Sequence, residues 1–577
     1  MDSRTAAHVL TQIGAILQAK GEQRFKARAY AGAARALIAI DTDDLAPLIQ
    51  SGELADTPGI GPATLSVIRE LVETGESSYL DRLRDGMPEG MLELMRVPGL
   101  SVAKVQLIHD ALGVDTIDDL ERVAQNGELA KLPKFGKKTA EKIVRGIEIL
   151  RRTGHLERFP RAVLDAQLIL ANVEKYPDIQ RAAVAGSIRR HNEVVADIDI
   201  VAQCSRDPSK VAGSFARSPG VSQATAGDDP GFVQIRFVDG THLDMYCVTP
   251  VDYPIALWRA TGSTEHVEDM VAFAEKKGFR IDGNALVSPG GKRMPVANED
   301  AFFTALGLTP IPPEMREGMG EIEAASRHAL PNLVTYDDLR GVLHCHTDYS
   351  DGGATIEEMA TAARERGWSY IGITDHSESA FYAGGLKREK LVLQHEEIDR
   401  LNAEMKDFRI LKGIEADILA DGRVDYDSEI LDRFDYVIGS IHSRFSMDAE
   451  TMTKRVLDAM DDPHLTILAH PTGRLLLSRE PYAIDIERVL DKAAAVGVSV
   501  ELNADPHRLD LDWRYCRLAK ELGVTIEIGP DAHSTAGLDN VHFGIGMARK
   551  AWLEAAEILN ARSADEVLAF ARKRRGK

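Results

Sequence analysis

The spacing of hydrophobic positions changes along the chain. In about the first 150 residues, segments such as AAHVLTQIGAILQAKG and RFKARAYAGAARALIAI carry apolar residues at intervals of three and four, which predicts helices. From about residue 160 the apolar runs are short, β-rich and bounded by Gly or Asp, as in AAVAGSIRR, ADIDIVAQ, FVQIRFVDG and THLDMYCV. These runs predict a mixed sheet with flanking helices.

A Pro-rich passage, LGLTPIPPEMREG followed by SRHALPNLVTYDDL, predicts an interdomain linker, because Pro-Pro cannot continue a helix. Beyond Arg340 the strand-like runs end in His, Asp or Asn and alternate with helical stretches: GVLHCHTDYS, SYIGITDHS, DYVIGSIHS, LTILAHPTG, VSVELNADP and VTIEIGPDAHS. This alternation predicts a parallel sheet or a β/α barrel, in which active groups lie at the carboxyl ends of the strands.

Length and composition narrow the class of protein. A chain of 577 residues suggests roughly three to five domains, and 44% hydrophobic with 28% charged residues is ordinary for a globular protein. The four cysteines lack C-x-x-C spacing, which argues against a disulfide scaffold and fits a reducing cytoplasm. No apolar run approaches the ~20 residues of a membrane span, so we expect no membrane partner and no export signal.

The formal charge of −21 is unevenly placed, because the front of the chain is near neutral and the segment after about residue 340 is acidic. A basic stripe with apolar residues at helical spacing lies in the front part: Lys131, Lys134, Lys137, Lys138, Lys142, Arg145, Arg151 and Arg152. This stripe predicts the surface where a polyanion binds.

The strand ends after Arg340 carry a set of metal-ligand residue types. His344 and His346 are two apart, so on a strand they share one face. The full set of candidate ligands is His344, His346, Asp351, His376, Glu415, His442, His470, Asp531 and His533. Imidazole and carboxylate ligands suit zinc, manganese or iron, and clusters of such ions hydrolyse phosphate esters. Alternatively, each histidine is a satisfied half-buried side chain, which is improbable for all of them at once.

At these residues the chain resembles the polymerase and histidinol phosphatase (PHP) domain. The resemblance is carried by His344-Cys345-His346-Thr347, Ser350-Asp351-Gly352, Thr374-Asp375-His376-Ser377, Ala469-His470-Pro471-Thr472-Gly473-Arg474 and Asp531-Ala532-His533. It implies a distorted (β/α)7 barrel with a trinuclear site for Mn²⁺, Zn²⁺ or Fe²⁺, in which all nine ligand positions are filled. Asn503 and Arg508 are expected to orient substrate or the ligands.

A second constellation lies in the middle sheet. Asp197 and Asp199 share a strand face, and Asp244 on a neighbouring strand could complete a site for two Mg²⁺ or Mn²⁺ ions that hold a nucleoside triphosphate. Asp-x-Asp alone is more often a solvated strand face. Preceded by Gly186-Ser187-Ile188-Arg189-Arg190, however, it resembles the nucleotidyltransferase palm.

The whole chain then resembles a bacterial family X DNA polymerase fused to a PHP barrel. The resemblance implies that the nucleotide-binding residues are Gly186, Ser187, Arg190, Gly262 and Ser263, and that Asp197, Asp199 and Asp244 are catalytic metal ligands. Three motifs resemble helix-hairpin-helix turns, which bind DNA phosphates through backbone N–H groups: Pro58-Gly59-Ile60-Gly61, Pro98-Gly99-Leu100 and Pro133-Lys134-Phe135-Gly136-Lys137-Lys138. Gly59, Gly61, Gly99, Gly136, Lys134, Lys137 and Lys138 are the expected DNA contacts. Ordinary Gly-Pro turns remain the alternative, above all for the second, where Ser101 replaces a glycine.

The chain also departs from the family pattern. Val67 stands where the family has a Schiff-base lysine, so we expect abasic-site lyase activity to be weak or absent. In the thumb, Arg259-Ala260 replaces an aromatic Tyr-Phe pair, and Val267 replaces an asparagine. These changes alter the walls of the nucleotide pocket and predict weakened polymerisation.

These observations predict a multidomain α and α/β protein, with a helix-hairpin-helix lyase-like domain (1–80), a fingers-like domain (81–155), a palm (156–248), a thumb (249–312), a linker (313–338) and a PHP domain (339–577). We expect a monomeric cytoplasmic DNA-repair enzyme, with a 3′-5′ exonuclease in the barrel and a gap-filling DNA polymerase that uses deoxynucleoside triphosphates in the palm. Three alternatives remain: a degenerate-palm nuclease, a small-metabolite phosphatase and a non-enzymatic scaffold for DNA ends. The basic stripe counts against the second, and the two carboxylate sets count against the third.

Overall fold

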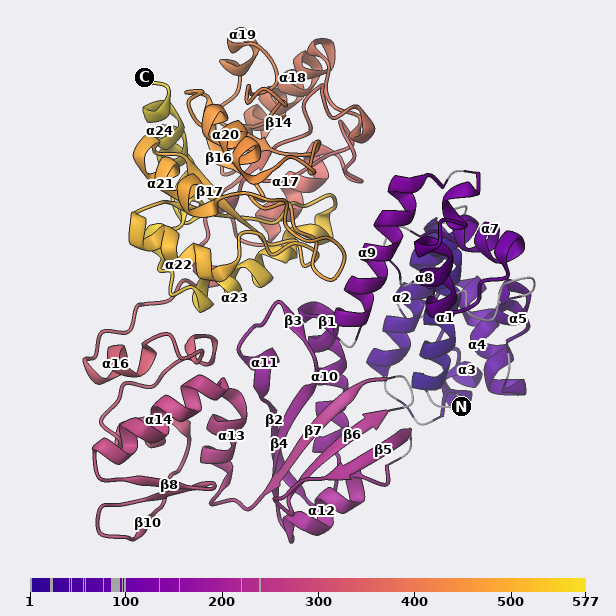
Figure 1. Ribbon diagram of the computed structural model, residues 1–577, viewed down its shortest axis with the longest axis vertical. Coiled ribbons are helices and arrows are strands. Elements are labelled where there is room, and N and C mark those ends of the chain that lie inside the picture. Colours follow the sequence, from indigo (N-terminus) through magenta and orange to yellow (C-terminus); the bar gives the residue numbers. More distant parts are fainter. Residues whose placement is uncertain are drawn as a thin grey trace. The chain divides into compact units, whose positions relative to one another are not determined.

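The structure is a computed structural model that describes residues 3–576, except residues 21–23, 41, 43, 56, 58, 76, 85–93, 96, 98, 99, 134, 155, 219, 238 and 239. The chain divides into two compact units, Met1–His155 and Leu156–Lys577 (Figure 1). The elements of the second unit form, in chain order, a mixed sheet, a helical region with a β-meander and a parallel-stranded barrel.

The described part of the first unit is helical, as its apolar spacing predicts. Its elements are α1 (Ser3–Lys20), α2 (Arg24–Ile40), α3 (Ala46–Ser51), α4 (Pro62–Thr74), α5 (Ser78–Arg84), α7 (Val102–Leu112), α8 (Ile117–Gln125), η1 (Leu129–Lys131) and α9 (Lys137–Thr153). Two hydrophobic clusters hold these helices together. Leu10 and Leu37 lie at the centre of one, formed mainly by α1, α2 and α4, and Val105 and Ile147 lie in the other, formed by α7 to α9.

The mixed sheet at the start of the second unit corresponds to the predicted palm. Its strand order is β2 (Ile179–Val184), β4 (Ile198–Cys204), β7 (His242–Val248), β6 (Phe232–Phe237) and β5 (Val221–Ala226). Strands β4 and β7 are parallel, and the remaining pairs are antiparallel. Ile198 and Ile200 join a hydrophobic cluster with residues of α10 (Phe159–Glu174) and α12 (Pro208–Phe215). Because side chains alternate along a strand, Asp199 lies on the opposite face.

The next region corresponds to the predicted thumb. It contains α13 (Tyr253–Thr261), α14 (Thr264–Lys276), β8 (Arg280–Asp282), β9 (Ala285–Val287), β10 (Arg293–Met294) and α15 (Glu299–Ala305). Residues of the segment expected to be a linker fold here as η2 (Pro313–Met315) and α16 (Glu321–Ser326). Met315 and Ile322 are buried in the same cluster as Trp258 and Phe302, because a Pro-rich segment that ends in apolar residues can cover a core as well as connect domains.

Beyond this region, a closed arrangement of parallel strands forms the predicted barrel. Its strands are β11 (Gly341–Val342), β12 (Tyr370–Ile373), β13 (Arg409–Lys412), β14 (Glu415–Asp417), β15 (Val437–Ser440), β16 (Leu465–Leu468), β17 (Ser499–Asn503) and β18 (Ile526–Gly529). Strand β13 pairs with β12 and the adjoining β14 pairs with β15, so the two act as one interrupted strand. A parallel bridge between Cys345 and Ala532 joins the first strand to the last.

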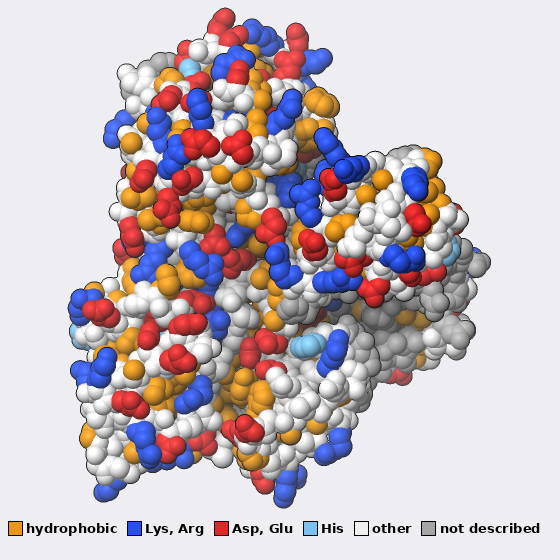
Figure 2. Space-filling model, viewed as in Figure 1, with side chains coloured by type: hydrophobic (Ala, Val, Ile, Leu, Met, Phe, Trp, Pro, Cys, Tyr) orange, Lys and Arg blue, Asp and Glu red, His pale blue; other side chains and the backbone are white. Residues whose placement is uncertain are grey.

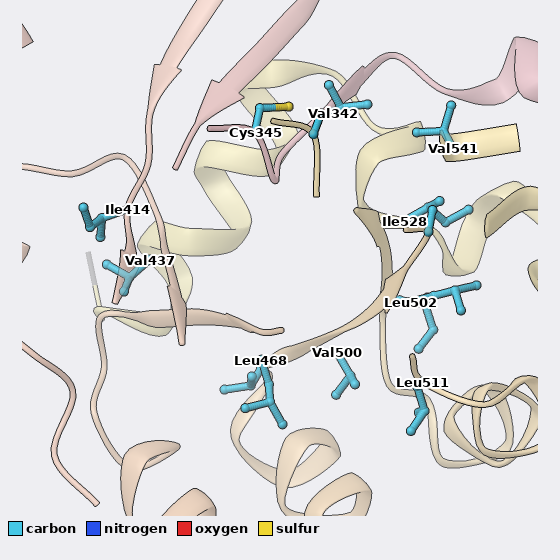
Figure 3. Packing of buried hydrophobic residues seen from close by; sticks show 14 of the residues in the cluster. Val342, Cys345, Ile414, Val437, Leu468, Val500, Leu502, Leu511, Ile528 and Val541 are labelled. Carbon is cyan, nitrogen blue, oxygen red and sulfur yellow. The ribbon is translucent and has the colours of Figure 1, made fainter. Parts of the chain in front are cut away.

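Helices cover the outside of the barrel: α17 (Ile356–Glu365), α18 (Arg388–Glu404), α19 (Ser428–Leu431), α20 (Ala449–Ala459), α21 (Ile486–Val496), α22 (Trp513–Leu522), α23 (Val541–Lys550) and α24 (Ala564–Arg574). Figure 3 shows Val500, Leu502 and Ile528 from β17 and β18 within the largest hydrophobic cluster. The hydrophobic packing between the strands and the outer helices fixes the backbone at each strand end. It therefore fixes the directions of the side chains that follow. On the face drawn in Figure 2, acidic and basic side chains are interspersed over the barrel.

Candidate functional site

The nine candidate ligands of the barrel lie at or just beyond strand ends. His344 and His346 follow β11, His376 follows β12, Glu415 opens β14, His442 follows β15, His470 follows β16, and Asp531 and His533 follow β18, while Asp351 lies in the turn before α17. Strands of a parallel barrel present their carboxyl ends at one rim, so residues spread over the chain meet there.

The structure brings eight of these residues into three overlapping groups whose ligand atoms lie within 4.8 Å of one another. The groups are His346, Asp351, His376 and His533; His344, His346 and Asp531; and His376, Glu415 and His442. The ninth residue, His470, lies outside these groups, although its Nε2 is 3.0 Å from Glu415 Oε1. Asp351 and His533 are 36% and 41% exposed, so the first group faces solvent. That exposure marks the side from which a substrate reaches the cluster.

The cluster has the donor set that divalent transition metals prefer. Buried ligand atoms have no hydrogen-bond partner among the described residues, including His344 Nε2, both ring nitrogens of His346 and Glu415 Oε2. Native proteins rarely leave buried polar atoms unpaired, and an unpaired atom that faces other ligands fits an ion-binding role. Mixed imidazole nitrogen and carboxylate oxygen donors suit zinc, manganese and iron. The residues present therefore fit the metal cluster that the sequence predicts.

The electrostatics of the cluster point the same way. Burial alone disfavours a charged ring, but Glu415 and Asp351 raise the pKa of His376 to about 10. Glu415 and Asp417 likewise outweigh burial and raise the pKa of His442 to about 9. Burial and the neighbouring histidines instead lower the pKa of His346 to about 3. The carboxylates thus create a field that attracts cations, and the neutral ring of His346 offers a lone-pair nitrogen within it.

A second layer of side chains orients the ligands. Glu501 Oε1 is 2.5 Å from His344 Nδ1, and Asp417 Oδ1 is 2.7 Å from His442 Nδ1. Each carboxylate fixes the ring and leaves Nε2 directed toward the cluster. Asn503 Nδ2 donates to Asp531 Oδ2 at 3.0 Å, and Arg508 Nε lies 3.3 Å from the same oxygen. The expectation that Asn503 and Arg508 orient groups of the site agrees with these contacts.

Three further carboxylates of the site, Glu501, Asp417 and Asp375, were not predicted from the sequence to have a role there. Asp375 accepts hydrogen bonds from the Thr347 backbone N–H, the Ser350 hydroxyl and the Gln394 amide, at 2.8, 2.5 and 2.6 Å. It thereby joins the loop after β11 to α18. A signal was present for two of the three, because Glu501 and Asn503, like Glu415 and Asp417, are two residues apart on a strand and share a face.

The palm carboxylates lie together on the face of the sheet opposite α10. Asp199 and Asp244 are register partners on the parallel strands β4 and β7, and Asp197 directly precedes β4. Burial and the charges of Asp197 and Asp244 raise the pKa of Asp199 well above its ordinary value. Gln234 Nε2 donates to Asp244 at 3.2 Å. Within the described residues, these three aspartates do not form a ligand group as tight as those of the barrel.

Gly186 is required by this arrangement. Its φ is +60°, and a Cβ at this position would lie 1.7 Å from Asp199 Oδ2. A side chain would therefore displace the central carboxylate. Next to it, the Ser187 hydroxyl is buried without a hydrogen-bond partner among the described residues, which fits a group that awaits a phosphate oxygen.

The other predicted nucleotide contacts are engaged within the protein. Arg190 Nε donates to Glu317 Oε1 at 2.8 Å, and Arg190 Nη1 donates to the Thr261 carbonyl at 2.7 Å. The Ser263 hydroxyl accepts from the His266 N–H and caps α14. A Cβ at Gly262 would lie 2.7 Å from His266 Cδ2, so this glycine is needed for packing. Arg190 must exchange a protein partner for phosphate if it binds a triphosphate.

The barrel contributes a residue to this region of the palm. Lys550 at the end of α23 is buried, and its ammonium donates to Asn192 Oδ1 at 2.8 Å, to the Arg190 carbonyl at 3.2 Å and to Glu317. Glu317 thus bridges Lys550 of the barrel and Arg190 of the palm. The barrel and the palm are joined by a buried network of charges.

The altered thumb positions line a pocket of about 340 Å³ between the palm sheet and α13. Arg259 and Ala260 border it from the thumb, and Tyr246 and Phe232 border it from the sheet. Arg259 Nη2 donates to the Gly283 carbonyl at 2.8 Å, which keeps the guanidinium on the thumb. Val267 packs against the thumb core. The structure therefore has an open space at the substituted Tyr-Phe position.

The helix-hairpin-helix turns are described in part. Gly59 has φ +93°, and Gly61 caps α4 with its N–H bound to Thr64 Oγ1 at 3.0 Å. Gly136 caps α9, and Lys137 and Lys138 are exposed in the first turn of that helix. Amides of a first helical turn have no partner within the helix and can bind a phosphate. Two other predicted contacts, Gly99 and Lys134, lie outside the described residues.

Two further positions in the first unit bear on function. Val67, at the expected Schiff-base position, is only 5% exposed within the core of α1, α2 and α4. Arg151 of the basic stripe is paired with Asp118 and Glu121 at 2.6 and 2.7 Å, so its charge is offset within the protein. The first turn of α9, rather than its last, presents the free basic side chains.

These features define a class of protein: a DNA polymerase of the palm and thumb type, preceded by helix-hairpin-helix elements and joined to a PHP phosphoesterase barrel. Family models agree, matching a helix-hairpin-helix domain at residues 1–77, a SAM-like helix-hairpin-helix tandem at 91–148, a DNA polymerase beta thumb at 256–317 and a PHP domain at 343–504. No helix in the described residues is long and apolar enough to cross a membrane.

Comparison with characterised proteins gives the family. The chain is 38% identical over 99% of its length, and over 99% of the relative, to the DNA polymerase/3′-5′ exonuclease PolX of Bacillus subtilis. A probable phosphatase of Caldanaerobacter subterraneus subsp. tengcongensis is 33% identical over 34% of this chain and 77% of its own. A probable phosphatase of Thermoanaerobacter sp. strain X514 is 29% identical over 38% of this chain and 90% of its own. The chain belongs to the PolX family of DNA polymerase/3′-5′ exonucleases.

Proposed function

We propose that the chain maintains DNA by two opposed reactions: the barrel removes nucleotides from 3′ ends, and the palm adds deoxynucleotides at short gaps. Membership of the PolX family makes the chain a DNA polymerase with an exonuclease, and its groups of metal-ligand side chains imply divalent cations. The assignment of each reaction to particular residues is our proposal, as are the ions, the deoxynucleoside triphosphate substrates and a monomeric state.

In the barrel, the three ligand groups would hold a trinuclear cluster, with Mn²⁺ the preferred ion because the donors mix nitrogen with several carboxylate oxygens. When bound, such ions activate water and neutralise the oxygens of the attacked phosphate. Glu501 and Asp417 hold His344 and His442 in position, and the exposed side of the cluster at Asp351 admits the phosphodiester.

In the palm, Asp197, Asp199 and Asp244 would hold two Mg²⁺ or Mn²⁺ ions. Burial and the other two carboxylates raise the pKa of Asp199, so its negative charge is unfavourable there without a counter-charge. Divalent cations bound together with a triphosphate would supply that charge, and Ser187 and Arg190 would contact the phosphates. Polymerisation is expected to be slow, because Arg259 and Ala260 offer no aromatic surface to the sugar and base.

In the first unit, the capped starts of α4 and α9 would bind the DNA backbone through amides, and Lys137 and Lys138 would add charge. A small-metabolite phosphatase would have no use for this unit, and the two probable phosphatases match only 34% and 38% of the chain.

One observation carries the proposal: the barrel holds three overlapping groups of metal-ligand atoms within a chain that also has a palm. The test is a labelled primer-template with a one-nucleotide gap, incubated with purified protein and Mn²⁺ or Mg²⁺. We expect shortening without deoxynucleotides and extension when they are present and the barrel is inactivated. A protein that does neither, yet hydrolyses small phosphomonoesters efficiently, would contradict the proposal.

A further inference from the structure

Two aromatic side chains beside the barrel cluster are exposed to an unusual degree. Phe381 is 85% exposed and Tyr382 is 62% exposed, the highest values among the large hydrophobic side chains of the described residues. Aromatic side chains normally contribute to cores, so adjacent exposed rings indicate a binding surface.

The loop that carries them is built to present them outward. Its closing hydrogen bonds run from Leu386 N–H to the His376 carbonyl at 2.8 Å and from Gly385 N–H to the Ala380 carbonyl at 3.1 Å. Ala380, Ala383 and Leu386 are buried, while the two larger aromatic residues between them point away from the core. The buried residues anchor the loop, and its turn leaves the side chains of Phe381 and Tyr382 exposed to solvent.

The pair also lies next to the proposed metal ligands. The Tyr382 ring is 6.3 Å from the ring of His376 and 6.2 Å from the ring of His442, measured between centroids. Phe381 meets Tyr382 edge to face, with centroids 6.2 Å apart and the ring planes at 78°. Because the two rings are nearly perpendicular and both are exposed, they leave an aromatic face open to solvent beside His376 and His442.

We propose that Phe381 and Tyr382 form a stacking platform for an unpaired base at the 3′ end of DNA. The inference rests on the proposed exonuclease function and names the form of its substrate. A nucleotide whose phosphodiester reaches the cluster carries its base within one sugar of that point, so the platform lies within reach of a base.

The chemistry of the platform selects a single-stranded end. A base presents its flat face only when it leaves the duplex, and aromatic side chains stack on any base with little sequence preference. The barrel therefore acts on single-stranded or frayed 3′ ends of any sequence. Fully paired ends must open before the terminal base can stack.

The kinetic test uses the full-length protein with Mn²⁺ and two single-stranded oligonucleotides, one ordinary and one with abasic residues at its last two positions. In the F381A/Y382A variant we expect KM for the ordinary end to rise about tenfold, the size of one lost base-stacking contact. In the wild-type protein, the ratio of KM for the abasic end to KM for the ordinary end should be well above one, which is a preference for the ordinary end. In F381A/Y382A this ratio should fall toward one.

Matched variants distinguish stacking on a flat aromatic ring from a non-specific hydrophobic contact. Phe381→Trp retains a flat face and should keep the preference, whereas Phe381→Leu retains only apolar bulk and should lose part of it. Tyr515→Ala removes a 38% exposed aromatic residue on α22 and should leave both values unchanged. An unchanged KM in F381A/Y382A, or an equal loss on both ends, would overturn the platform and leave the pair as a surface for another partner.

A binding measurement distinguishes failure of the platform from failure of the exonuclease. The probe is an oligonucleotide with 2-aminopurine as its 3′ base and a terminal phosphonate linkage that resists hydrolysis. Stacking quenches its fluorescence, so wild-type protein should quench it and F381A/Y382A should not. If the wild-type protein shortens no DNA, the proposed function fails, but quenching still supports the platform; if neither protein quenches the probe, the platform is wrong whatever the exonuclease does.

Discussion

The barrel and the palm both bring acidic side chains together to bind metal ions, but the barrel site is preorganised and the palm site is not. In the barrel, buried imidazoles and carboxylates converge, and outer carboxylates already hold His344 and His442. In the palm, three carboxylates without a histidine repel one another, and Arg190 is bound to Glu317. The barrel is prepared for ions before substrate arrives, whereas the palm needs the nucleotide and its ions to complete it.

This difference follows from where the ligands come from. Barrel ligands come from the ends of six separate strands and from one turn, and the hydrophobic packing around the strands gives each side chain a defined direction. Palm ligands come from two neighbouring strands and the residue just before one of them, and burial together with the charges of Asp197 and Asp244 raises the pKa of Asp199. The fold alone therefore positions the metal ligands of the nuclease site, whereas the polymerase site needs its nucleotide substrate to complete its metal binding.

The largest expected effect is loss of the nuclease. Replacing His344 and His346 together by Ala removes ligands from two of the three groups and should reduce primer shortening to background, while extension persists. The measurement is gel analysis of a labelled primer with Mn²⁺ and no deoxynucleotides, with Tyr515→Ala as the control. Shortening at the wild-type rate would show that the cluster is not the nuclease.

Primer extension should depend on the palm aspartates and not on the barrel histidines. With the barrel inactivated by the substitutions above, we expect slow, manganese-favoured extension on short gaps, and Asp197→Ala should abolish it. Loss of the aromatic pair should weaken nucleotide affinity by roughly ten- to a hundredfold relative to an aromatic pocket. Extension with micromolar affinity would mean that Arg259 and Ala260 matter little; no extension at millimolar nucleotide would mean that the palm is degenerate.

A smaller effect is expected from the layer behind the ligands. Glu501→Gln keeps the size of the side chain but removes the charge that orients His344, so Mn²⁺ affinity should fall about 10- to 100-fold. Titration of the shortening rate with Mn²⁺ measures this, and saturating Mn²⁺ should restore most of the rate. A loss that Mn²⁺ cannot restore would assign Glu501 a role other than orientation.

The smallest expected effect concerns DNA affinity. Replacing Lys134, Lys137 and Lys138 by Ala should flatten the dependence of log K on log salt by up to about 3 units, if each lysine meets one phosphate. Fluorescence anisotropy at several salt concentrations gives the slope, and Arg151→Ala, which removes an already paired charge, is the matched control. An equal slope in the wild-type and triple-variant proteins would place the DNA elsewhere.

The sequence predicts much of this architecture because the informative residues repeat with the strands. His344, His376 and Asp531 could be identified from their places after apolar runs, and the barrel geometry then required them to meet. The helices of the first unit follow equally directly from apolar residues at spacings of three and four.

Other features depend on contacts between distant parts of the chain. Nothing near Arg190 shows that Glu317 binds it, or that Lys550 of the barrel binds the same carboxylate. The partners of Asp375 are likewise set by the packing of α18 against the loop after β11. Tertiary packing determines such contacts between distant residues, so the local sequence pattern does not predict them.

The central claim is that the barrel holds its ions without substrate and the palm does not. Equilibrium dialysis against Mn²⁺ without DNA or nucleotide tests it, using wild-type protein, H344A/H346A and D197A/D244A. We predict up to three tightly bound ions per wild-type chain, the number unchanged in the aspartate variant and reduced in the histidine variant, with further ions only when a deoxynucleoside triphosphate is added. Tight ions that disappear from the aspartate variant and remain in the histidine variant would contradict the account.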